Sequence, residues 1–190
     1  MALVSVAVPS GAATKSISIR GVTTPPYDPK VAKGAQGTTF EWTNDDSINH
    51  TATQDGPLRK WDTGVVSPGA SDGSTVNWAG TYPYHCSIHT SMKGVVKVPI
   101  VLSATSVSVG SAVTVTVATQ NAPSGYTYDV QTKTGSGSWG FWQRGVSGRN
   151  QTFTPSTAGT YSFRARLRDT AGTNKGATSG WSPSKSVTAT

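Results

Sequence analysis

Alternation of valine with serine or threonine is the sequence feature that most limits how this chain can fold. The run ATSVSVGSAVTVTVATQ, residues 104 to 120, places an apolar side chain at almost every second position. This period gathers one set of side chains on a single face of a β-strand, whereas a helix repeats about every 3.6 residues. We therefore expect Val113, Val115 and Val117 to face one core.

Short segments bounded by Gly, Pro, Asn or Asp follow one another along the rest of the chain. These bounding residues favour turns, and no long stretch has apolar residues at helical spacing. We predict strands at residues 16–21, 37–44, 74–80, 81–86, 94–98, 126–133, 139–145, 150–155, 159–169 and 182–190. The chain is therefore predicted to be all-β.

The residue pattern changes after VVKVP, where loops rich in Asp, Pro and Gly give way to alternating Val and Ser or Thr. This change predicts two domains, residues 1–99 and 100–190. About seven strands in the second domain are the number expected for an immunoglobulin-like β-sandwich. The segments YDVQTKTGSGSW, AGTYSFRARLRDTAG and SGWSPSKSV resemble strands of a fibronectin type III domain. The resemblance implies that Tyr161 is a corner tyrosine whose hydroxyl bonds back to the chain.

The net charge of +7 is unevenly distributed. Residues 1–98 carry eight Lys or Arg against seven Asp or Glu, and residues 99–190 carry eight against two. Part of the excess is the strand RARLR, where Arg164, Arg166 and Arg168 share one sheet face. No nucleic-acid motif accompanies it, so we expect a solvated face and no nucleic-acid partner.

No run of eighteen or more apolar residues occurs, and no membrane span is predicted. The first sixteen residues, MALVSVAVPSGAATKS, lack the basic and apolar regions of a signal peptide. The sequence leaves the oligomeric state open.

Soft metal-binding side chains are rare in this chain but gather in one segment. GTYPYHCSIHTSMKG holds the only cysteine, Cys86, followed at spacings of three by His89 and Met92. A single cysteine is a buried hydrophobe, a reactive thiol, half of an intermolecular bridge or a metal ligand. Thiolate, imidazole and thioether argue against Ca²⁺, Mg²⁺ and Mn²⁺. Zn²⁺ gains little from a thioether, whereas copper gains from all three.

A second imidazole has two candidates. His85 adjoins Cys86 on a predicted strand, so its side chain points to the opposite face from the thiolate. His50 follows the strand in EWTNDDSINHT, and sheet pairing can bring it beside the Cys86 loop. We therefore favour His50.

With its flanking strands, GTYPYHCSIHTSMKG resembles the cupredoxins, and the amicyanin and plastocyanin branch in particular. YDPKVAKGAQGTTFEWTNDDSINH and WDTGVVSPGASDGSTVNWAGTY are similar to the segments before the first and second ligands of that family. The resemblance covers residues 15–98 and implies a Greek-key β-sandwich or barrel. It implies one copper ion per chain bound by His50, Cys86, His89 and Met92.

The same resemblance implies a type 1 copper electron carrier with an unidentified redox protein partner, secreted, on the cell surface or periplasmic. Residues implied to lie around the ligands are Thr51 and Asn49. The implied electron-transfer patch is His89 with Ile88, Leu58 and Pro57.

Enzyme activity is not expected, and we assign no catalytic residues. Multicopper oxidases need more histidines than this chain has, and no Gly-x-Ser-x-Gly elbow occurs. The alternative is an extracellular copper-delivery or adhesion protein, with Trp139, Phe141 and Trp142 as a platform on the second domain. Core and turn packing explains those three aromatic residues more simply.

Overall fold

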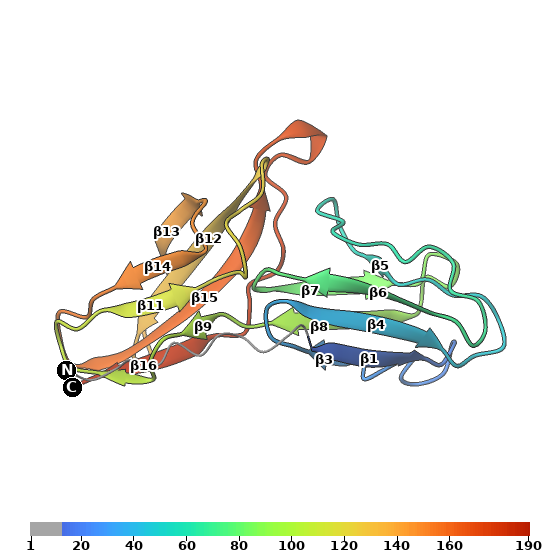
Figure 1. Cartoon of the computed structure of the whole chain (residues 1–190), viewed down its shortest axis with the longest axis horizontal. Coiled ribbons are helices and arrows are strands. Elements are labelled where there is room, and N and C mark those ends of the chain that lie inside the picture. The colour runs from blue at the N-terminus through green and yellow to red at the C-terminus, as the bar shows by residue number, and fades with distance from the viewer. Residues whose placement is uncertain (1–12) are drawn as a thin grey trace.

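The computed structural model describes residues 13–190, which form four β-sheets in two pairs (Figure 1). The prediction of an all-β chain is confirmed. Residues 1–12, which hold most of the segment that does not read as a signal peptide, lie outside the described residues. No helix within residues 13–190 has the length and apolar character needed to cross a membrane.

Residues 14–98 supply the first pair of sheets. One has the order β2 (Tyr27–Asp28), β1 (Thr14–Ile19), β4 (Thr38–Asn44) and β6 (Ser71–Val76). The other has the order β3 (Val31–Lys33), β8 (Lys93–Val98), β7 (Gly80–His85) and β5 (Thr53–Gln54). Strict alternation along β4 buries Phe40 and Trp42, and Trp42 packs edge to face on Tyr84 of β7, so the core lies between the two sheets.

Residues 101–189 supply the second pair. The larger sheet has the order β10 (Ser106–Val107), β16 (Lys185–Ala189), β15 (Gly159–Asp169), β12 (Tyr126–Thr134) and β13 (Gly140–Val146). The smaller has the order β14 (Asn150–Phe153), β11 (Val113–Thr116) and β9 (Val101–Leu102). One short 3₁₀ turn, η1 (Gly172–Asn174), follows β15.

The alternating run 104–120 is divided between β10 and β11, which lie in different sheets. Gly110, at φ +84°, lies in the turn that separates them, a conformation that glycine adopts without strain. Val113, Val115 and Val117 are all buried, as predicted. The Tyr161 hydroxyl donates to the Thr157 carbonyl at 2.9 Å, so it does bond back to the chain.

The three arginines of β15 share a face, but the prediction that this face is solvated is wrong. Arg166 and Arg168 both bind Asp129 of β12, at 2.9 and 2.5 Å, and their side chains are 20% and 19% exposed. Arg164 and Arg166 also stack on the ring of Trp181. The three guanidinium groups are therefore partly covered, and one carboxylate, Asp129, offsets one of their three positive charges.

The two pairs of sheets contact each other at the start of β7. Thr81 and Gly180 exchange backbone hydrogen bonds of 3.0 and 2.9 Å, and Lys60 lies 3.9 Å from the centre of the Tyr126 ring. Cys86 follows the other end of β7, about 17 Å from Thr81 at the usual rise of a strand. The predicted ligand loop is thus at the end of the first pair that lies away from this contact.

Candidate metal centre

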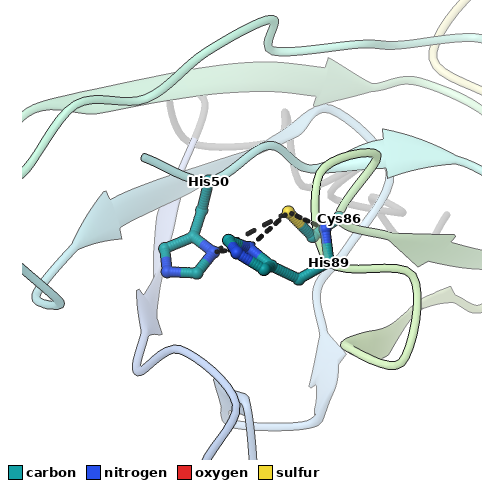
Figure 2. A group of neighbouring side chains, drawn as sticks. All are labelled: His50, Cys86 and His89. Atoms are coloured by element: carbon teal, nitrogen blue, oxygen red, sulfur yellow. Dashed lines mark hydrogen bonds between the residues drawn. The ribbon is translucent and has the colours of Figure 1, made fainter. Parts of the chain in front are cut away.

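Three side chains with metal-binding atoms meet on loops that follow strands of both sheets (Figure 2). His50 comes after β4, Cys86 directly follows β7, and His89 lies three residues further on, before β8. The backbone of His50 is fixed by paired hydrogen bonds with Val66, at 3.2 and 2.8 Å. Strand ends and this bridge therefore set the positions of all three residues.

The donor atoms form a small triangle. Nδ1 of His50 lies 3.1 Å from Nδ1 of His89, and these nitrogens lie 3.7 and 3.8 Å from Cys86 Sγ. A point equidistant from the three atoms is about 2 Å from each, the length of a bond between an imidazole nitrogen and a first-row metal such as zinc. In Figure 2 both rings turn one nitrogen toward the other ring and the sulfur. A single metal ion therefore fits among these atoms.

Met92 closes the loop that carries Cys86 and His89. Its carbonyl accepts a hydrogen bond from the N–H of Cys86 at 3.1 Å, and its own N–H donates to the His89 carbonyl at 2.9 Å. The side chain is only 1% exposed. The loop curls back on itself within seven residues, and Met92 stays the predicted axial ligand.

The sulfur of Cys86 lies in an environment that favours the thiolate. Burial raises the pKa of the thiol, but hydrogen bonds from the backbone N–H groups of Thr51 and His89, at 3.3 and 3.4 Å, together with the contacts of the two imidazoles, outweigh burial. The pKa of Cys86 is lowered to about 6. The residue is therefore largely deprotonated at neutral pH, the form that binds metals.

Asp46 orients the His50 ring. Its Oδ2 lies 2.9 Å from Nε2 of His50, the ring nitrogen that is not part of the cluster. This hydrogen bond is the main reason that the pKa of Asp46 is lowered. A carboxylate at Nε2 places the proton there and leaves the lone pair of Nδ1 directed at the cluster.

Thr51 connects the two ligand loops. Its hydroxyl accepts a hydrogen bond from the N–H of Ser87 at 2.7 Å, while its own N–H donates to Cys86. Its carbonyl accepts a hydrogen bond from the buried hydroxyl of Tyr27 at 2.6 Å. Thr51 was predicted to lie around the ligands, and these bonds show how it does so.

Sequence reasoning missed Asn44, which holds the loop before His50. Its side-chain amide donates to the carbonyls of Ile48 and Val66, at 2.7 and 2.8 Å, and its oxygen accepts from the N–H of Asp46. Asn44 is fully buried at the end of β4. A polar residue at an inward-facing strand position is the signal that could have identified it.

Of the other predicted site residues, three lie at the surface and one is buried. Asn49 is exposed and makes no side-chain hydrogen bond within the described part of the chain. Ile88 and Pro57 are exposed. Leu58 cannot belong to an exposed patch, because its side chain is 5% exposed and packs into the core.

His85 lies outside the cluster, as its strand position predicts. Its Nδ1 bonds to the carboxylate of Asp55, and the side chain is 30% exposed. Within residues 13–190, the group of potential metal-binding side chains that includes an imidazole consists of His50, Cys86 and His89. With a thioether, two imidazoles and a thiolate make the donor set of a type 1 copper site.

Neither a scan against protein-family models nor a search of curated proteins finds a match. Solved structures similar to this chain include a purple cupredoxin from Nitrosopumilus maritimus, at 29% identity over 44% of this chain and 97% of that one, with a TM-score of 0.41. A copper-containing nitrite reductase from Thermus scotoductus is 28% identical over 48% of this chain and 23% of its own, with a TM-score of 0.39. A point mutant of amicyanin in its reduced Cu(I) form is 26% identical over 48% of this chain and 86% of its own, with a TM-score of 0.39.

Proposed function

We propose that His50, Cys86, His89 and Met92 bind one copper ion and that the protein carries single electrons between redox partners. The observation that carries this proposal is the triangle formed by two imidazole nitrogens and a sulfur, about 2 Å from a common point. A site of two imidazoles, a thiolate and a weak axial thioether is typical of blue copper electron transfer.

The donor set fits copper better than the other common metals. Ca²⁺ and Mg²⁺ prefer oxygen ligands, and none belongs to the cluster. Zinc accepts the thiolate and the imidazoles, but a structural zinc site is usually completed by a fourth thiolate, imidazole or carboxylate, and the thioether of Met92 is none of these. The low pKa of Cys86 supplies a thiolate without need of an external base.

Copper, when bound, supplies one-electron chemistry through its Cu(II)/Cu(I) couple. The chain's own contribution is to hold the ligands still, so that little rearrangement accompanies each transfer. Asp46 fixes the His50 ring, the Thr51 and His89 N–H groups stabilise negative charge on the sulfur, and Met92 ties the loop. Burial of Cys86 and His50 keeps water from these groups.

His89 is the half-buried ligand, and we propose its outer edge as the point of electron transfer. Ile88 beside it is 49% exposed. Ile48 and Val65, on loops adjoining His50 and its partner Val66, are 48% and 60% exposed. Exposed apolar side chains around a ligand suit the small, transient contact of a redox pair.

The second pair of sheets has a docking or spacing role in this proposal, and the fibronectin type III resemblance stays a prediction for it. Its contact with the first pair lies at the opposite end of β7 from Cys86. A partner can therefore reach His89 without displacing the second domain. We place the protein outside the cytoplasm and propose that it transforms no substrate.

The test is a titration of the metal-free protein with Cu(II), with visible absorption and cyclic voltammetry as readouts. We expect an intense visible band at one equivalent and a reversible one-electron wave. His50→Gln should weaken or abolish the band, whereas His85→Gln, which removes an imidazole outside the cluster, should leave it unchanged. A colourless complex, or copper lost at once to a competing chelator, would instead favour zinc binding or copper delivery.

A further inference from the structure

We propose that Trp61 and Trp42 form a relay through which a strong one-electron oxidant at the surface draws an electron from Cys86 or from the metal that it binds. The relay would give the protein a second electron-transfer route, separate from His89, that quenches oxidising radicals. The metal-bound form of this inference rests on the proposed function, whereas the thiolate form does not.

The outer end of the relay is a surface hollow. Trp61 lines it together with residues 59, 60, 62, 63, 73 and 74, which belong to β6 and to the loop after β5. None of these residues belongs to the loops that carry His50, Cys86 and His89. The indole is 6% exposed, so a small oxidant can approach its edge while most of the ring remains in the core.

Aromatic rings connect Trp61 to the neighbourhood of the sulfur. The rings of Trp61 and Trp42 are stacked, with centres 5.8 Å apart. The ring of Tyr84 packs edge to face on the ring of Trp42, with centres 5.4 Å apart, and on the ring of Tyr27, with centres 4.8 Å apart. At these separations neighbouring rings touch, which favours rapid electron transfer between them.

The inner end of the chain reaches Cys86 by two short connections. The Tyr27 hydroxyl donates to the Thr51 carbonyl at 2.6 Å, and the Thr51 N–H donates to Cys86 Sγ at 3.3 Å. Tyr84 precedes Cys86 by two residues along the same strand end. Tyr84 and Tyr27 therefore bridge the gap between Trp42 and the sulfur.

We expect the two tryptophans, and not the tyrosines, to be the residues that are transiently oxidised. The Nε1 atoms of Trp42 and Trp61 are both buried and have no hydrogen-bond partner among the described residues. An oxidised indole therefore keeps its proton and can be reduced again by electron transfer alone. Tyr84 and Tyr27 are both fully buried and act only as a bridge.

The electron count is simple. The oxidant takes one electron from Trp61, Trp61 regains one from Trp42, and Trp42 regains one from the Cys86 thiolate or the reduced metal. In the metal-free protein the thiolate becomes a thiyl radical. Because an indole is harder to oxidise than a thiolate or Cu(I), each oxidising equivalent moves inward, and the resting centre does not oxidise the tryptophans.

The experiment uses the metal-free protein with a photo-oxidant in the hollow. Ser74 lines the hollow and is half-buried, so Ser74→Cys can be coupled to a maleimide-linked polypyridyl ruthenium complex. Cys86 is fully buried, which directs the label to the new thiol. After flash-quench generation of Ru(III), transient absorption follows the tryptophan radical.

We expect the radical to decay at least tenfold faster when Cys86 is present than in a Cys86→Ser background. Trp42→Phe should restore the long lifetime, because phenylalanine is too hard to oxidise. As a matched control, the same label on Ser138→Cys lies beside Trp139, whose ring contacts no ring of the relay within the described chain. That radical should have the same lifetime with and without Cys86.

Equal lifetimes with Cys86 and with Ser at position 86 would overturn the relay, and so would failure to form a radical from the Ser74 position. These two results do not depend on whether Trp42→Phe folds. If Trp42→Phe folds and the decay stays fast, Trp42 is not a station and the proposal is wrong. Because these measurements use the metal-free protein, they do not depend on whether the protein binds copper. The two proposals can therefore fail separately.

Discussion

The hydroxyl of Thr51 accepts a hydrogen bond from the N–H of Ser87 at 2.7 Å, across 36 positions of sequence. One residue thereby holds the His50 loop against the Cys86 loop, and its own N–H also bonds to the sulfur. The separation of the two imidazole ligands depends on this contact. It is therefore a sensitive place to perturb the site without removing a ligand.

Thr51→Val removes the hydroxyl and keeps the shape and the backbone N–H. We predict a metal affinity about tenfold or more weaker, since groups that orient metal ligands typically contribute that much. Competition with a chromophoric chelator measures it. Thr90→Val, on the exposed part of the ligand loop, should have no effect. Equal affinities for the two variants would show that the contact does not position the ligands.

Asp46→Ala removes the acceptor at Nε2 of His50. The ring then loses the group that fixes its orientation and tautomer, and we predict a tenfold to hundredfold loss of metal affinity, on the order of other such contacts. Asp72→Ala, an exposed carboxylate on β6, is the matched control. Isothermal titration calorimetry of both variants with Cu(II) measures the difference in metal affinity. The prediction is wrong if Asp46→Ala and Asp72→Ala bind Cu(II) with equal affinity.

Met92→Leu replaces the axial thioether with an apolar side chain of similar size. Because the axial ligand tunes the site and the thiolate dominates its colour, we predict that the visible band persists and that the reduction potential rises. Cyclic voltammetry and absorption of the same sample give both quantities. Cys86→Ser should abolish the band altogether. An unchanged potential in Met92→Leu would mean that the sulfur of Met92 is not near the metal.

Asp129 makes the stability of the second pair of sheets depend on pH. Burial raises the pKa of this carboxyl, but hydrogen bonds from Arg168 and Arg166 outweigh burial and hold the pKa below its usual value. A lowered pKa in the folded state means that the stabilisation is fully present above about pH 4, the usual Asp value. It is lost as the pH falls through the lower, folded value.

Asp129→Asn should therefore lower the free energy of unfolding at pH 7 by about 3 kcal/mol, as expected when a buried ion pair is broken. The deficit should shrink as the pH falls below about 4. Urea unfolding followed by fluorescence measures it. Asp28→Asn, in a surface pair with Arg20, should cost less than about 1 kcal/mol at any pH. A deficit that does not change with pH would contradict the assignment.

Local patterns in the sequence predicted most of the longer strands and most of the ligand loop, but not the short strands β2, β3, β5 and β9. Period-2 alternation placed Val113 and Val115 in the core, because burial on one face imposes that period. Cys86 and His89 lie in one loop, and their spacing sufficed to bring them together. His50 needed a further premise, the pairing of distant strands, which the resemblance to cupredoxins supplied.

Contacts between distant segments could not be predicted in the same way. The carboxylate of Asp46 at His50, the hydroxyl of Thr51 at Ser87 and the amide of Asn44 depend on how loops fold over each other. Leu58 was expected in the exposed patch that the resemblance implies, yet the turn carries it into the core. The ion pairs of Arg166 and Arg168 depend on Asp129, which lies opposite Arg166 in the neighbouring strand.

X-ray absorption at the copper edge, on the one-to-one copper complex, tests the central claim most directly. The account predicts a nearest shell of one sulfur and two imidazole nitrogens, with the sulfur lost in Cys86→Ser and one imidazole lost in His50→Gln. A shell of oxygen and nitrogen without sulfur, unchanged by either substitution, would show that copper binds elsewhere and would contradict the account.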